Sequence, residues 1–131
     1  MAEKSKTYRD GLEVRTAVLG KAHVERAQSR MTKLDEEFQD LITRYCWGEI
    51  WTRPGLERKT RSMLNLAMLA ALGREEEFKL HLRATRNTGV SRDEVKEVLL
   101  QVAIYAGVPA ANSAFRMARE VFQEIDKEAA R

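Results

Sequence analysis

No segment of this chain sustains the alternation of apolar and polar residues that a half-buried β-strand requires. Apolar residues recur instead at three- and four-residue intervals, and only two prolines and seven glycines interrupt the 131 residues. The segment 56–72, LERKTRSMLNLAMLAAL, begins with basic turns and becomes apolar on every side, which is typical of a central, buried helix. These patterns predict an all-α fold of about six helices.

Short polar motifs predict where the helices begin and end. Ser91 and Glu94 have the spacing of a capping box at the start of a helix. Thr32 and Asp35 form a similar signature, and the segment 53–55, Arg-Pro-Gly, predicts a turn that ends the preceding helix. These motifs predict the starts of two helices and the end of one.

The length fits a single domain that spans residues 1–131. The segment 8–30 carries good helix formers but an irregular apolar stripe, so we expect residues 1–30 to form a peripheral helix or arm. The helices predicted at 59–72 and 94–106 have more apolar surface than a domain of this size can bury. Association into a homo-oligomer would cover that surface.

Composition and charge exclude several classes of protein. Hydrophobic residues make up 44% and charged residues 33%, which is too apolar for a disordered chain. The formal net charge is +3, but basic and acidic residues alternate, so we expect no nucleic-acid partner. The longest apolar stretch is too short to span a bilayer, the N-terminus has no signal core, and one cysteine permits no internal disulfide. We expect a cytoplasmic protein without a membrane anchor.

His81 is the more promising of the two histidines. On a helix, Glu77 and Phe78 would be its neighbours, and a carboxylate beside an imidazole suits general acid chemistry. The alternative is a half-buried histidine bonded to a backbone carbonyl. Glu77 and His81 could also supply two metal ligands, but no third ligand stands at motif spacing, so we expect no metal.

A basic cluster at the predicted start of a helix suggests an anion. Arg53, Arg58, Lys59 and Arg61 occupy a place where cations oppose the helix dipole, so a bound carboxylate or phosphate would explain them. The alternative is a solvated face that pairs with nearby glutamates. A second basic pair follows His81, at positions 83 and 86.

Both tryptophans lie in one short segment, 45–56, YCWGEIWTRPGL. Trp47 and Trp51 are four residues apart and would share a helix face, with Glu49 between them. A carboxylate beside indole rings can have a raised pKa. Cys46 is flanked by aromatic residues, and we interpret it as a buried thiol rather than a reactive one.

The segment 47–115 resembles the 4-carboxymuconolactone decarboxylases of the protocatechuate branch of the β-ketoadipate pathway. The most specific motifs are WGEIW with RPGL, LHLRA at 80–84 and AIYAGVPAAN at 103–112. The resemblance implies the all-helical fold of alkylhydroperoxidase D-like proteins and a homo-oligomer, typically a hexamer. It also implies cofactor-independent decarboxylation of 4-carboxymuconolactone, a small dicarboxylate lactone, to the β-ketoadipate enol-lactone.

The resemblance also suggests roles for particular residues. His81 would donate the proton or stabilise the oxyanion, and Glu49 would orient a partner or carry the proton itself. The remaining predicted site residues would bind substrate, either as carboxylate clamps or as an apolar wall. They are Arg53, Arg61, Arg83, Trp47, Trp51 and Tyr105.

Two departures separate this chain from its relatives. The peroxidase branch of the fold carries Cys-x-x-Cys-x-x-x-His, whereas Arg74 and Glu77 occupy the two cysteine positions here. Decarboxylases often have a second histidine where this chain has Gln101. The alternatives to a decarboxylase are an alkylhydroperoxidase-like redox protein, which the missing cysteines disfavour, and a lactone-binding protein without catalytic activity.

Overall fold

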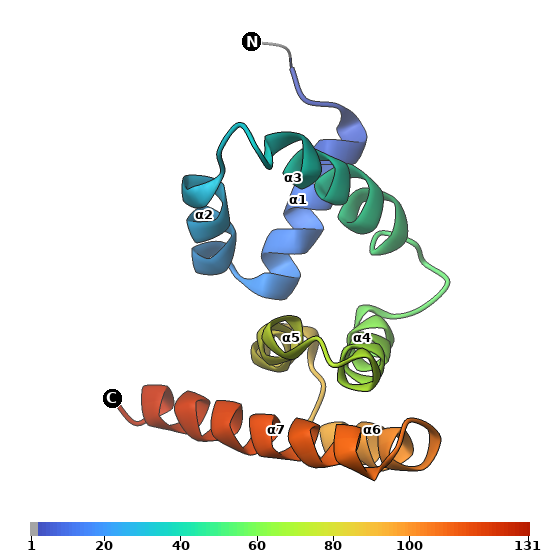
Figure 1. Ribbon diagram of the computed structural model, residues 1–131. Coiled ribbons are helices and arrows are strands. Elements are labelled where there is room, and N and C mark those ends of the chain that lie inside the picture. The colour runs from blue at the N-terminus through green and yellow to red at the C-terminus, as the bar shows by residue number, and fades with distance from the viewer. Residues whose placement is uncertain (1–2) are drawn as a thin grey trace. The chain divides into compact units, whose positions relative to one another are not determined.

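The computed structural model describes residues 3–131 and divides after Glu57 into two compact units, each described here by itself (Figure 1). The described residues contain seven α-helices, one π-helix and no β-strand. The first unit contains α1 (Lys6–Leu19), α2 (Lys21–Arg30), α3 (Glu36–Ile42) and the π-helix η1 (Thr43–Ile50). The second contains α4 (Arg58–Leu72), α5 (Glu75–Thr88), α6 (Arg92–Tyr105) and α7 (Val108–Ala129). The predicted all-α class is confirmed.

The N-terminal segment forms two helices rather than the one that its composition suggests. Ser5 caps α1 by accepting a hydrogen bond from the backbone N–H of Tyr8 at 3.1 Å. The chain then breaks at Gly20, whose φ of 94° lies in a region that side-chain-bearing residues rarely adopt. The helix–helix corner at this glycine directs α2 away from the axis of α1 (Figure 1).

Two glycines bring α1 and η1 into backbone contact. A Cβ atom on Gly11 of α1 would overlap the carbonyl oxygen of Thr43 and lie 2.7 Å from the backbone nitrogen of Gly48. A Cβ atom on Gly48 would overlap the carbonyl oxygen of Thr7. Only glycine permits this approach, so the pair determines how the first unit packs.

The turn before α3 uses the predicted polar pair, but not as a helix cap. The Asp35 carboxylate accepts a hydrogen bond from the backbone N–H of Thr32 at 2.8 Å, and the Thr32 hydroxyl accepts one from the N–H of Leu34 at 3.2 Å. The helix itself starts one residue later, at Glu36. Thr32 and Asp35 therefore close a tight turn.

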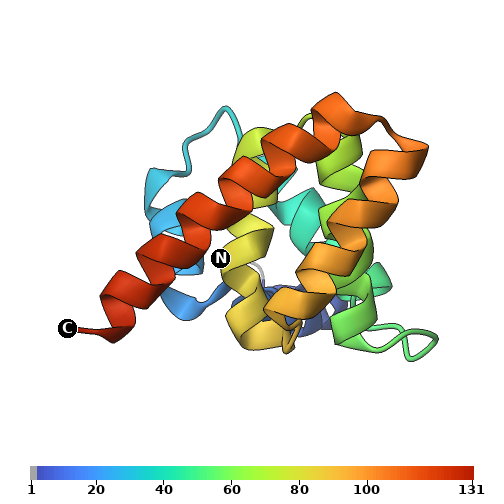
Figure 2. The same cartoon turned by 90° about the horizontal axis from the view of Figure 1, so that it is seen from below.

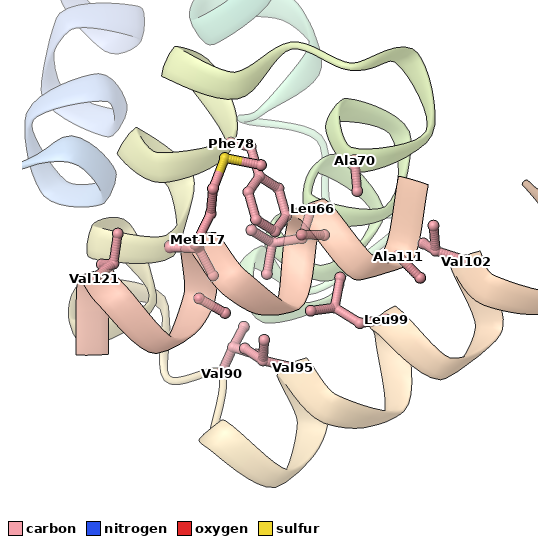
Figure 3. Close-up of a cluster of buried hydrophobic side chains, with 13 residues drawn as sticks. Leu66, Ala70, Phe78, Val90, Val95, Leu99, Val102, Ala111, Met117 and Val121 are labelled. Carbon is pink, nitrogen blue, oxygen red and sulfur yellow. The ribbon is translucent and has the colours of Figure 1, made fainter. Parts of the chain in front are cut away.

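The four helices of the second unit enclose one hydrophobic core. Helix α4 contacts α5, α6 and α7, and the long α7 crosses α5 and packs against α6 (Figure 2). The core side chains come from all four helices and from the α5–α6 connection (Figure 3). They are Leu66, Ala70, Phe78, Leu82, Val90, Val95, Leu99, Val102, Ala111, Ala114, Met117, Ala118 and Val121.

Helix α6 begins with the predicted capping box. The Ser91 hydroxyl accepts a hydrogen bond from the N–H of Glu94, and the Glu94 carboxylate accepts one from the N–H of Ser91, both at 3.0 Å. Lys59 of α4 also contacts that carboxylate at 2.8 Å. These bonds lower the pKa of Glu94, with the Lys59 bond as the largest cause.

Replacing Ser91 by alanine is expected to destabilise the second unit by about 1 kcal/mol, because an N-terminal N–H of α6 loses its acceptor. Urea unfolding followed by far-UV circular dichroism measures the change. Ser29→Ala is the matched control, because the Ser29 hydroxyl is exposed and donates only to the Arg26 carbonyl in the last turn of α2. Equal unfolding midpoints for both variants would contradict a capping role for Ser91.

Candidate active site

His81 lies on the buried face of α5 and retains only 8% of its accessible surface. Phe78 and Leu82, at helical spacing around it, are fully buried in the core of the second unit. Glu77 lies in the first turn of α5, where the helix dipole stabilises acidic side chains. Its side chain is exposed. The structure therefore separates the two residues by environment, with a buried imidazole and a solvated carboxylate.

A buried pair of hydroxyl groups joins the helix that carries Arg61 to the helix that carries His81. Thr88, in the last turn of α5, donates a hydrogen bond to the hydroxyl of Ser62 at 2.9 Å. Ser62 is fully buried, and the adjacent Arg61 is half-buried in the first turns of α4. This bond positions α4 against α5 at the end where the basic cluster lies.

Acidic side chains contact several of the predicted cations, among them Arg86, which lies 3.2 Å from Glu128 of α7. Lys59 pairs with Glu94, as described above, and Arg83 of α5 contacts Glu124 of α7 at 3.1 Å. A substrate carboxylate at Arg83 would have to compete with Glu124. Within the predicted cluster Arg53 and Arg58 are exposed, whereas Lys59 and Arg61 are half-buried, and the Nε atom of Arg61 is buried.

In the first unit, the two tryptophans stack on each other as their spacing predicted. The ring centroids of Trp47 and Trp51 are 4.8 Å apart with an interplanar angle of 25°, and both side chains are buried. Trp47 belongs to η1, and π-helical turns occur frequently at functional sites. Glu49, between them in sequence, is exposed, as is Arg53 in the following turn.

Cys46 is half-buried, and burial raises the pKa of its thiol, while the charge of Arg15 opposes the shift. Little thiolate is present at neutral pH under these conditions. The environment fits the interpretation of Cys46 as a packing residue.

Tyr105 lies at the end of α6 and is 81% exposed. Together with Gln101 and Met68 it lines an apolar cavity of about 400 Å³ between α4 and α6. His81 is not among the residues that line this cavity. The structure thus brings Tyr105 close to Gln101, the position where relatives often carry histidine.

Within the described residues, no three His, Cys, Asp or Glu side chains are placed to share a metal ion. None of the described helices is long and apolar enough to cross a membrane. Arg15 of α1 has an unusual environment that was not predicted from the sequence, because its side chain is buried and the residue retains only 8% of its accessible surface. Its position between the apolar Val14 and Val18 is the signal that could have found it.

The chain is a member of the carboxymuconolactone decarboxylase family, whose sequence profile matches residues 36–120. The match includes both stacked tryptophans and all of α4, α5 and α6.

Individual relatives define the similarity more closely. The chain is 52% identical to a 4-carboxymuconolactone decarboxylase of Acinetobacter baylyi over 90% of its own length and 88% of that protein. A 4-carboxymuconolactone decarboxylase of Pseudomonas putida is 45% identical over 37% of this chain and 100% of its own sequence. The nitrosuccinic acid decarboxylase npaB of Metarhizium robertsii is 36% identical over 92% of this chain and 85% of that protein.

Proposed function

We propose that this protein decarboxylates 4-carboxymuconolactone to the β-ketoadipate enol-lactone in protocatechuate catabolism. The observation that carries the proposal is 52% identity, over 90% of the chain, to the 4-carboxymuconolactone decarboxylase of Acinetobacter baylyi. The family match begins in the first unit and continues through most of the second, so we propose that residues 1–131 act as one functional domain.

The substrate supplies its own electron sink. The departing carboxylate is on the γ-carbon of an unsaturated lactone, so cleavage of its C–C bond releases CO₂ and moves the electron pair through the ring double bond onto the lactone carbonyl. Protonation of the resulting dienolate at the α-carbon gives the enol-lactone. The reaction balances without an external oxidant or reductant, and we propose that it needs neither a metal nor an organic cofactor.

The protein must then hold the second carboxylate, stabilise the developing oxyanion and deliver one proton. We propose His81 for the oxyanion or the proton, because a buried imidazole acts in surroundings where electrostatic interactions are strong. Glu49 is the second candidate for the proton carrier. We propose Arg61 as the first candidate for the carboxylate clamp, ahead of Arg53 and of Arg83, which Glu124 already engages.

The proposed substrate also requires apolar contacts for its ring. Trp47, Trp51 and Tyr105 are our candidates for such a wall. The tryptophans offer a stacked indole pair, and Tyr105 borders an apolar cavity.

The direct test is an assay with 4-carboxymuconolactone generated in situ, in which loss of the lactone and release of CO₂ are followed together. We expect equal turnover with and without a chelator. A folded protein that does not turn over the lactone would refute the proposed substrate. Activity that a chelator abolishes and a divalent metal restores would refute the cofactor-independent reaction.

Replacing Arg61 by lysine is expected to raise KM about tenfold or more, because lysine keeps the charge but loses the two-pronged contact with a carboxylate. Steady-state kinetics measure the effect, with Arg58→Lys as the matched control because Arg58 is exposed in the same turn. If Arg83→Lys or Arg53→Lys raises KM while Arg61→Lys does not, the clamp is the other arginine.

We also propose that the protein is a homo-oligomer, with a hexamer favoured, that it is cytoplasmic, and that it binds no nucleic acid. Exposed apolar side chains along α4 and α6 support the oligomer, since association would remove them from water. They are Leu64, Met68, Leu72, Leu100, Ile104 and Tyr105. Sedimentation equilibrium of the purified protein tests the stoichiometry, and a monomer at micromolar concentration would contradict it.

The fungal relative suggests a second substrate to test. A nitro group on the carbon that loses CO₂ can accept the electron pair, as the conjugated lactone carbonyl does. Because the chain is 36% identical to a nitrosuccinic acid decarboxylase, nitrosuccinate is the alternative substrate if the lactone is not consumed. No thiol occupies the two peroxidase cysteine positions, 74 and 77, so we do not propose a redox function.

A further inference from the structure

The first unit contains a buried cation that none of its own carboxylates neutralises. Arg15 of α1 is 8% exposed, and its Nη1 donates to the side-chain oxygens of Gln39 at 3.2 Å and Thr43 at 3.4 Å, both of them neutral. Its Nε is buried and has no hydrogen-bond partner among the described residues. No carboxylate of residues 3–131 lies within ion-pair distance of this guanidinium, which is an unusual environment for a buried charge.

Arg15 also borders a cavity of the first unit. This cavity has a volume of about 950 Å³ and is lined by α1, α3, η1 and the end of α2. Leu12, Phe38 and Leu41 give it apolar surface, and Tyr8 adds an aromatic side chain. A guanidinium at the side of a partly apolar cavity is the arrangement that binds an organic acid by its carboxylate and its hydrocarbon part together.

The other charges around the cavity favour a singly charged ligand. Asp40 is engaged by Arg44 at 2.6 Å and Lys4 at 3.3 Å, and these bonds hold its pKa below the usual range, with the Arg44 bond as the largest cause. Glu36 and Glu37 also line the cavity and are exposed. These acidic groups repel a phosphate dianion more strongly than a monocarboxylate.

We propose that the cavity bordered by Arg15 is a binding site for a small organic carboxylate. The carboxylate contacts the guanidinium of Arg15, and its apolar part lies against Leu12 and Phe38. Burial lowers the pKa of Arg15, because it disfavours the charged form of the guanidinium. The site lies wholly within the first unit and does not depend on the reaction proposed for the protein.

The test uses 4-fluorobenzoate as the probe and ¹⁹F NMR as the readout of binding to the full-length protein. We expect Arg15→Met to weaken binding about tenfold or more, because the charged hydrogen-bond donor is lost. Arg9→Met removes an exposed arginine from the same helix and is expected to leave binding unchanged. Arg61→Lys is expected to leave binding at this site unchanged as well, which separates it from the proposed active site.

A second measurement on the wild-type protein covers the case in which Arg15→Met does not fold. The ¹⁵N resonance of Arg15 Nε, assigned with Arg15→Lys, should move on addition of benzoate but not of chloride at equal ionic strength. Equal affinity of the Arg15→Met and Arg9→Met variants for 4-fluorobenzoate overturns the proposal. An Nε resonance that does not move on addition of benzoate overturns it as well. An Nε resonance that moves only with protein concentration also overturns it, because the carboxylate then comes from a second copy of the chain.

Discussion

Replacing His81 by glutamine is expected to lower kcat for the decarboxylation by roughly 10²–10⁴-fold, the usual contribution of a positioned acid or base. Glutamine approximates the size of the imidazole and keeps a hydrogen-bond donor, but it cannot transfer a proton at neutral pH. The buried face of α5 also leaves little room for water to replace the imidazole. Steady-state kinetics on the folded variant measure the change.

The second histidine provides the matched control. His23 lies on α2 in the first unit, and burial is the main cause that lowers its pKa, followed by the charge of Arg15. His23→Gln is expected to leave kcat within about twofold of the wild type, because His23 is not among the proposed site residues. Unchanged kcat in the His81 variant would remove His81 from the mechanism and direct attention to Glu49.

Replacing Gly11 by alanine is expected to destabilise the first unit by about 2 kcal/mol or more. The steric overlap of the added methyl group outweighs the higher helix propensity of alanine. In an open helix the same change would stabilise the protein by up to about 1 kcal/mol. Here the new methyl group meets backbone atoms of Thr43 and Gly48, which cannot rotate away as a side chain can. Helix α1 and η1 would have to separate.

Tryptophan fluorescence during urea unfolding measures this effect selectively. Both tryptophans of the chain lie in the first unit and are buried there, so their emission reports on that unit. Gly55→Ala is the matched control, because a Cβ atom at Gly55 has no neighbour within 4 Å. A Gly11→Ala variant as stable as the Gly55→Ala variant would show that α1 and η1 are not held at this distance in solution.

Local patterns in the sequence predicted most of the second unit correctly. The apolar spacing of 94–106 and the Ser91–Glu94 motif identified α6 and its capping box, and the all-apolar half of the segment 56–72 identified a helix that contributes to the core. These signals act between residues three or four positions apart, so they can be recognised in a single sequence.

The N-terminal half was less predictable for a physical reason. A helix was expected over 8–30, but Gly20 adopts a positive φ and divides it, and one glycine does not reveal which conformation it takes. The turn at Thr32 and Asp35 uses the hydrogen-bonding atoms of a capping box one residue before the helix begins. The π-helical turn of η1 has no clear sequence signal at all.

The candidate site, like the fold, was predicted from the sequence only in part. The sequence identified His81 as a chemically interesting residue on a helix, and it predicted that Trp47 and Trp51 would share a face. It could not show that Arg83 is held by Glu124, or that Ser62 and Thr88 join α4 to α5, because these partners are far apart in the chain.

By itself the sequence determined the helical class, most helix boundaries and the resemblance to a decarboxylase family, since all of these depend on neighbouring residues or on short motifs. Only the tertiary structure decided which cations have partners and which residues are buried. Gly11 and Gly48 show the reason, because their importance comes from two backbones that approach each other across 37 positions in sequence. Arg15 is a second example, because its guanidinium becomes a buried charge only after α1 and η1 have packed around it.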